Sequence, residues 1–161
     1  MLFGEADILK LYGRFRRINV SKSELLSLDE ISSLGHDISD NPLLERVFNT
    51  LVEPGQSGVS FERLVAYLSR IASPNEEDKL RVIFDVYDVN RDGFISNGDL
   101  FKTVRMMCGD NLSRTQLQQL TDRTIRDFDT IDYDGKISFD EFRAGIEATK
   151  IKLQNQLNLD W

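Results

Sequence analysis

A run of oxygen-bearing residues between Asp88 and Asp99 has the composition and spacing of a divalent-cation loop. Carboxylate, amide and hydroxyl side chains alternate along it, and Gly93 lies where a sharp turn requires a positive φ. A hard cation takes about six to eight oxygen ligands, which such a loop supplies at alternate positions. The pattern predicts a calcium loop with these ligands: the side chains of Asp88, Asn90 and Asp92, the carbonyl of Phe94, a water-mediated contact from Ser96, and Asp99 at the closing position.

Asp99 is shorter by one methylene than the Glu that usually closes a loop of this kind. We therefore expect weaker calcium binding here, with magnesium as an alternative ion. A turn rich in Asp and Asn that binds nothing is the simpler interpretation. The flanks favour the cation loop, because apolar residues recur at helical spacing on both sides: Leu80, Ile83, Phe84 and Tyr87 before it, and Leu100, Val104 and Met107 after it.

The helix–loop–helix pattern occurs four times in the 161 residues. The residue at the eighth position of each loop is aliphatic (Leu26, Val59, Ile95 and Ile137), as expected if paired loops meet in a short two-stranded bridge. The sequence thus predicts an all-α fold of four EF-hand repeats in two lobes, with β-bridges between paired loops. Pro74 and its polar neighbours break the pattern, so we expect an N-terminal pair at 1–73, a C-terminal pair at 74–149 and a tail at 150–161.

The first loop, Asn19–Glu30, carries too few charges to offset dehydration of a divalent ion. Asn19, Ser21 and Ser23 lie where acids would be needed, and Glu24 replaces the turn glycine. We interpret Glu30 as a solvated residue at the start of the next helix. Apolar stripes remain on both sides of the loop and predict a packing role: Leu11, Phe15 and Ile18 in the incoming helix, and Ile31, Leu34 and Ile38 in the outgoing one.

The second loop, Val52–Arg63, also departs from a cation site. Val52 is its first residue and Pro54 its third. Arg63 brings a positive charge to the closing position, where an ion would need a carboxylate. This loop is expected to serve packing alone.

The fourth loop contains one residue more than the third. Counting back from Gly135 and Glu141 over the usual length would start the loop at Thr130, but this would place Asp122, Arg126 and Asp129 on the buried helix face. A thirteen-residue loop from Asp129, with an insertion near Thr130 and Ile131, avoids that conflict. Its expected ligands are Asp129, Asp132, Asp134, the carbonyl of Lys136, Ser138 and a bidentate Glu141, and Asp129 reaches the ion only if the inserted bulge folds outward.

Composition limits the classes of function. The net charge is −7 and no basic face is apparent, which argues against a nucleic-acid partner. Cys108 is the single cysteine, so no internal disulfide is possible and a reducing, cytoplasmic setting is expected. No signal peptide or transmembrane segment is visible. The single histidine, His36, has no nucleophile at a known spacing, so we expect no enzyme activity.

The tail carries apolar residues among polar ones: Ile151, Leu153, Leu157, Leu159 and Trp161. We expect it to form a helix that packs on its own lobe, and its alternative role is to cover or extend a partner-binding groove.

Several segments are similar to the calcineurin B family, whose members are regulatory subunits of a calcium- and calmodulin-dependent protein serine/threonine phosphatase. They are Tyr87–Asp88, Asp92–Gly93, Ile95–Phe101, Met106–Met107, Asn111–Leu112 and Thr115–Gln119, with weaker matches at Arg14–Phe15 and Asn41–Leu43. The resemblance implies a non-catalytic chain that forms a heterodimer. An amphipathic helix of the catalytic subunit would lie in its hydrophobic groove.

The departures from that family leave two alternatives open. Family members usually have four metal loops and a myristoylated N-terminal glycine, whereas here two loops are degraded and Leu2 stands at the glycine's place. Degenerate first and second loops also occur in calcineurin-homologous proteins, which bind a cytoplasmic segment of sodium/proton exchangers, and the Glu53–Gly55 segment is similar to theirs. A constitutive EF-hand light chain, whose metal sites serve stability only, is the second alternative.

Overall fold

The computed structural model describes residues 3–159, with side chains at all of these positions except 36–37 and 155–159. Three expectations lie outside the described part: the role of Leu2, the surroundings of the His36 ring, and the packing of Leu157, Leu159 and Trp161.

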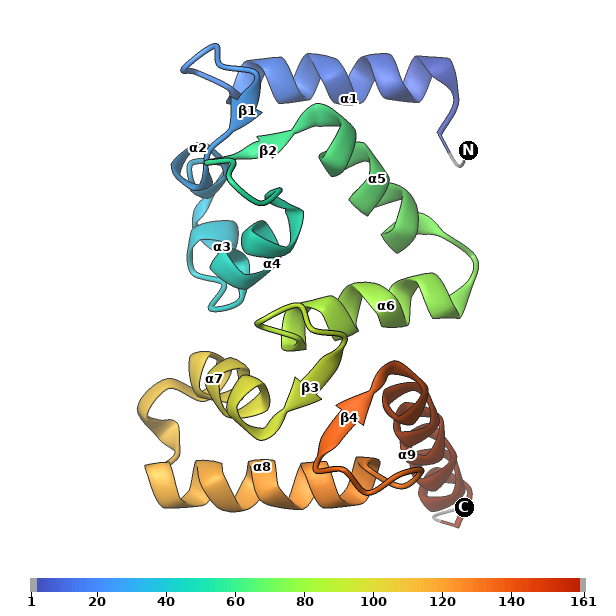
Figure 1. The fold of residues 1–161 in the computed structure, drawn as a ribbon. Helices are drawn as coiled ribbons and strands as arrows, with labels where there is room; N and C mark the ends of the chain where they lie inside the picture. Colours follow the sequence, from blue (N-terminus) through green and yellow to red (C-terminus); the bar gives the residue numbers. More distant parts are fainter. Residues whose placement is uncertain (1–2, 160–161) are drawn as a thin grey trace. The chain divides into compact units, whose positions relative to one another are not determined.

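Helices dominate the described chain, and each pair of loops contributes two short strands (Figure 1). In chain order the elements are α1 (Glu5–Ile18), β1 (Leu25–Leu26), α2 (Leu28–Ser32), α3 (His36–Ser39), α4 (Leu44–Leu51), β2 (Val59–Ser60), α5 (Phe61–Ala72), α6 (Glu76–Tyr87), β3 (Phe94–Ser96), α7 (Asn97–Cys108), the 3₁₀ helix η1 (Gly109–Asn111), α8 (Arg114–Phe128), β4 (Lys136–Ser138) and α9 (Phe139–Leu159). The predicted all-α class is confirmed.

Two compact units make up the chain, Met1–Val82 and Ile83–Trp161. The division falls inside α6, whereas the sequence places the lobe boundary near Pro74. Helix α5 ends at Ala72 and α6 begins at Glu76, so a helix break does occur at the expected place. The predicted extents of the two lobes and the tail remain a prediction.

Antiparallel bridges join the loops within each unit, as predicted (Figure 1). In the first unit Leu26 pairs with Val59, and in the second Ile95 pairs with Ile137. All four side chains are almost completely buried. The bridge of the second unit is longer, with three residue pairs where the first has two. Each loop is therefore held in register with its neighbour by a β-ladder and an aliphatic contact.

The helices begin at capping residues that the sequence supplies. Ser27, Ser96 and Ser113 each accept a hydrogen bond from the backbone N–H three residues later, and the acid or amide at that later position accepts one from the serine N–H. These reciprocal caps satisfy N–H groups that the first helical turn leaves free. The capping box predicted at Ser113 and Gln116 is confirmed.

The outgoing stripe of the first repeat differs from the prediction. In place of one continuous helix, the structure has the short helices α2 and α3, separated at Gly35 with φ 155°. Leu34 and Ile38 are exposed rather than buried. Because of this break, Leu34 and Ile38 do not continue the apolar face that begins at Ile31. Of these three residues, only Ile31 packs against the core of Phe48, Leu51 and Val59.

Helix α9 runs through the tail without a break, so the tail is helical to residue 159. Ile151 and Leu153 are 57% and 55% exposed, so these two residues do not pack on the lobe as expected. None of the helices in the described residues combines the length and apolar character needed to cross a membrane.

Candidate metal centre

The third loop is a tight turn that is organised by the carboxylate of Asp88. Its two oxygens accept hydrogen bonds from the N–H groups of Asp92 at 3.2 Å and Gly93 at 2.9 Å. Arg91 and Gly93 have φ values of 57° and 87°, and this positive φ is what the glycine permits without strain. The loop therefore wraps around Asp88 at its start.

Burial raises the pKa of Asp88, and the N–H groups of Gly93 and Asp92 oppose that rise only in part. The Asp92 carboxylate also raises the pKa of Asp88 by electrostatic repulsion. A buried carboxylate beside a second carboxylate is stabilised in its ionised form by a nearby positive charge. The electrostatics and the hard oxygen donors of this loop fit a divalent cation.

The remaining expected ligands of the third loop lie around the same turn. Asn90 accepts a hydrogen bond from Asp92 N–H at 3.2 Å, and Phe94 is the first residue of β3. Ser96 is the N-cap of α7. Asp99 is buried and one of its oxygens, Oδ2, accepts hydrogen bonds from the N–H and hydroxyl of Ser96 at 3.1 and 2.5 Å. Because its arm is short, these contacts of Asp99 stay within the first turn of α7.

The fourth loop repeats this geometry with one extra residue. Asp129 accepts a hydrogen bond from Gly135 N–H at 2.7 Å, the same contact that Asp88 makes with Gly93. Tyr133 and Gly135 have φ values of 55° and 84°, matching Arg91 and Gly93. The turn is therefore in register from Asp132 onward, and the additional residue lies between Asp129 and Asp132.

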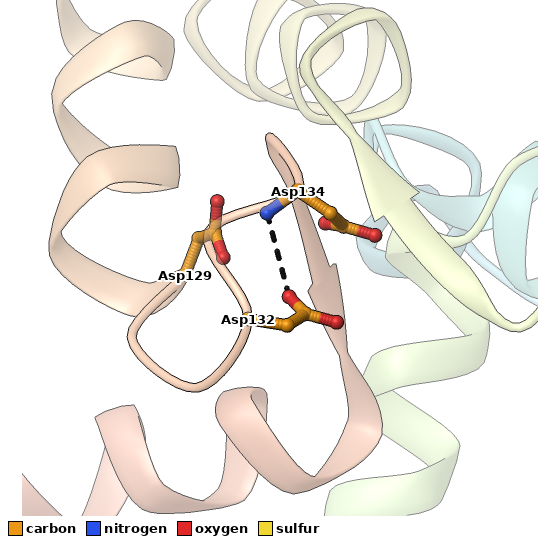
Figure 2. A group of neighbouring side chains, drawn as sticks. All are labelled: Asp129, Asp132 and Asp134. Carbon is orange, nitrogen blue, oxygen red and sulfur yellow. Dashed lines mark hydrogen bonds between the residues drawn. The ribbon is translucent and has the colours of Figure 1, made fainter.

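Three carboxylates of this loop converge (Figure 2). Asp129, Asp132 and Asp134 each offer one oxygen within 4.8 Å of the others. Asp129 is only 6% exposed, and its Oδ1 atom is buried without a hydrogen-bond partner. A buried carboxylate oxygen with no donor is costly unless a cation approaches it. The donor set of this loop fits a divalent ion.

Glu141 closes the fourth loop from the other side. Its Oε1 accepts hydrogen bonds from the N–H groups of Thr130 and Ile131 at 3.1 and 3.0 Å, and its Oε2 from the N–H and hydroxyl of Ser138, both at 2.9 Å. Burial opposes ionisation of Glu141, but these hydrogen bonds together lower its pKa. Lys136 and Ser138, the other expected ligands, are the first and last residues of β4.

The first loop satisfies its polar groups internally. The Ser21 hydroxyl oxygen lies 3.0 Å from Oδ1 of Asn19 and 3.2 Å from Oγ of Ser23, so the three neutral side chains at the ligand positions contact one another. Glu30 accepts from the N–H groups of Ser27 and Ser21, both at 2.9 Å, and these bonds lower its pKa to about 2. Glu30 does start a helix as expected, but it also reaches back across its loop.

The second loop contains its own cation. Arg63 lies 3.7 Å from the carboxylate of Glu53 and donates a hydrogen bond to the carbonyl of Leu51 at 3.4 Å. The guanidinium thus joins the two ends of the loop. Sequence reasoning identified the Arg63 charge but missed its partner Glu53, for which the opposite charges at the two loop ends were the available signal.

An apolar groove lies beside the metal loops in the second unit and has a volume of about 280 Å³. Ile83 and Leu120 in its lining are 46% and 43% exposed. Phe128 in its wall packs so closely on Gly145 that a Cβ there would overlap the ring, so a larger residue would displace Phe128. The full lining is Ile83, Tyr87, Ile95, Leu100, Val104, Leu120, Thr124, Phe128, Ile137, Phe142 and Ile146. Ile95 and Ile137 belong to the β-bridge, so the groove floor is continuous with the loops.

Paired helix–loop–helix units with bridged cation loops define an EF-hand protein, and the family model of an EF-hand domain pair matches residues 77–147. Calcineurin B type 1 of Dictyostelium discoideum is 41% identical over 160 residues, which cover 99% of this chain and 87% of the relative. Calcineurin B type 2 of Bos taurus is 41% identical over 150 residues (92% and 87%), and calcineurin B of Yarrowia lipolytica is 39% identical over 158 residues (98% and 90%).

The chain belongs to the calcineurin B family. The resemblance noted from its sequence is confirmed, and it extends over almost the whole chain. Membership also confirms that the chain is a non-catalytic subunit and not an enzyme.

Proposed function

We propose that this chain is the calcium-binding regulatory subunit of a calcineurin-type protein serine/threonine phosphatase, and that its groove binds an amphipathic helix of the catalytic subunit. The observation that carries this proposal is the groove of the second unit, whose floor is formed in part by the bridge between the two metal loops. Its half-exposed aliphatic side chains are the kind of surface that receives the apolar face of a helix.

The third loop is the proposed calcium site, with Asp88, Asn90, Asp92, Phe94, Ser96 and Asp99 as ligands. A bound divalent ion supplies positive charge to a turn whose carboxylates repel one another. Two parts of the chain then connect the third loop to the groove. Asp99 is part of the first turn of α7, and Ile95 lies in the groove, so ordering of this loop fixes two elements that contact the partner helix.

In this proposal the structure of the first unit does not depend on calcium. Its loops are closed by Asn19, Ser21 and Ser23 in one case and by the pair of Glu53 and Arg63 in the other. No calcium is needed for either arrangement. We place the resulting heterodimer in the cytoplasm, in keeping with the single, half-buried free thiol of Cys108.

A constitutive structural subunit is the second candidate, and Asp99 is the observation that favours it. The contacts of Asp99 with Ser96 form without an ion, and its short arm weakens the preference for calcium over magnesium. If magnesium fills the third loop at cellular concentrations, calcium signals change little in the complex.

Calorimetric titration with calcium in a magnesium background separates these two functions. Asp88→Ala is expected to abolish binding at the third loop, whereas the control Asp110→Ala, which removes an exposed acid in η1 outside the loops, leaves it intact. Sensor loops bind calcium with dissociation constants of about 10⁻⁷ to 10⁻⁵ M, and we expect the weak end of that range. Undiminished calcium binding by Asp88→Ala would refute the third-loop assignment.

Binding of the partner helix is tested with the matched substitutions Ile83→Glu and Ile151→Glu. Both place a carboxylate at an exposed isoleucine, but only Ile83 lines the groove. We expect Ile83→Glu to weaken binding of the catalytic subunit at least about tenfold, because a charge is buried without a partner. Equal affinities of the two variants would contradict the proposed docking surface.

A further inference from the structure

The carboxylates of the fourth loop fall into two groups with different surroundings. Asp129 has a buried oxygen that receives no hydrogen bond, and that residue converges with Asp132 and Asp134 (Figure 2). Glu141 is even more deeply buried, at 1% exposure, but each of its oxygens accepts two hydrogen bonds. A carboxylate offers about four acceptor sites, so those of Glu141 are filled.

Two of these four bonds come from the segment that contains the inserted residue. Thr130 and Ile131 follow Asp129 directly, and their N–H groups both point to Oε1 of Glu141. To bind an ion with both oxygens, Glu141 would have to give up these two hydrogen bonds. The longer loop thus competes with an ion for its own closing residue.

The first loop shows that this closure needs no cation. Glu30 makes the equivalent contacts, with one oxygen on its helix cap at Ser27 and the other on the loop N–H of Ser21. The side chains at the ligand positions there are neutral. A glutamate in this pose stabilises the loop through its hydrogen bonds to the backbone. With Glu141 in the same pose, only the aspartates of the fourth loop are available to bind an ion.

We infer that the fourth loop binds a divalent cation through Asp129, Asp132 and Asp134 while Glu141 stays on the backbone and does not ligate the ion. Calcium depends on the two oxygens of a closing glutamate, whereas magnesium keeps several waters and needs only one or two carboxylates. The site therefore discriminates poorly against magnesium. The inference rests on the proposed function, because it refines how the second unit of a calcium-binding subunit is loaded.

Terbium luminescence provides a direct test, since this ion accepts the same oxygen ligands as calcium and Tyr133 lies within the loop. Experiments use the full chain in an Asp88→Ala background, which silences the third loop, and Tyr133→Phe identifies the signal that arises from the fourth. Decay lifetimes in light and heavy water give the number of waters bound to the ion. Absence of a Tyr133-dependent signal overturns the inference, while the calorimetric test of the third loop decides the proposed function separately.

Deletion of Ile131 restores the usual loop length and removes one of the two competing N–H groups. We expect the deletion to release Glu141 to the ion, so that about two waters are lost from the coordination sphere. The preference for calcium over magnesium, measured by displacement of terbium, should rise about tenfold. An unchanged or higher water number in a folded deletion variant would overturn the inference that the inserted backbone keeps Glu141 from the ion.

Glu141→Ala decides the question if the deletion variant does not fold. In our assignment the water number stays the same, because no ligand is lost. A rise of about two waters, or loss of the terbium signal at saturating concentration, identifies Glu141 as a bidentate ligand and overturns the inference.

Discussion

The two units contain the same bridged pair of loops but differ in how the polar groups inside these loops are satisfied. In the first unit, hydroxyl and amide groups bind one another and Arg63 supplies a fixed positive charge. In the second, Asp88 has a raised pKa and Asp129 has an oxygen without a donor. The backbone turn can therefore form with or without an ion. A loop that binds an ion differs in that its stability depends on the concentration of that ion.

Matched truncations of core residues should have the largest effect and should show whether calcium stabilises one unit and not the other. Leu26→Ala and Ile137→Ala each remove a buried bridge residue, and we expect a loss of about 2–5 kcal/mol from the unit concerned. Saturating calcium should restore protection in the second unit only, because binding adds stability in proportion to the logarithm of ligand concentration over the dissociation constant.

Hydrogen exchange resolved by peptide measures the two units separately in these variants. The parent chain with and without calcium is the control. Calcium-dependent recovery of protection around Leu26 would contradict the division into a constitutive and a responsive unit.

Asp99→Glu sharpens the comparison inside the second unit. The longer arm is expected to reach the ion with both oxygens and to raise calcium affinity at the third loop about tenfold, or roughly 1.4 kcal/mol. Calorimetry with calcium and with magnesium checks the result. An affinity gain for magnesium as large as that for calcium would show that the length of the closing residue does not set the selectivity.

Local chemistry explains why much of the fold and the third loop could be predicted from sequence. Ligand types, the turn at Gly93 and the helical stripes all lie within a short stretch of chain, and the phase of α8 sufficed to place the insertion before Asp132. The contacts of Glu141 could not be foreseen, because they depend on how the inserted backbone turns. The break at Gly35, which exposes Leu34 and Ile38, was also missed, although a glycine within the helical stripe was the available signal.

Glu30→Gln tests whether the first loop is held by its own closing carboxylate. Hydrogen bonds lower the folded pKa of Glu30 to about 2 from an ordinary value of 4.5. The ionised group therefore stabilises the fold fully above pH 4.5, and this contribution disappears as the pH falls towards 2. We expect a lower melting temperature for the variant at pH ~6 and a difference that shrinks through that window.

Glu62→Gln is the control for this effect, since it removes an exposed acid at the start of α5 in the same unit. Its melting temperature should follow that of the parent chain more closely across the same pH range. Equal behaviour of both variants would mean that the contacts of Glu30 contribute nothing beyond its charge.

Arg63→Glu should have the smallest effect, although it restores the usual closing residue of a calcium loop. Both partners of the Arg63–Glu53 pair are about half exposed, so its loss should cost no more than about 1 kcal/mol. Calcium binding should remain absent from the second loop, because Val52 and Pro54 provide no side-chain oxygen at its first and third positions. A new calcium site detected by calorimetry in this variant would show that a closing carboxylate alone can turn the second loop into a calcium-binding loop. The difference in calcium binding between this loop and those of the second unit would then depend on a single residue.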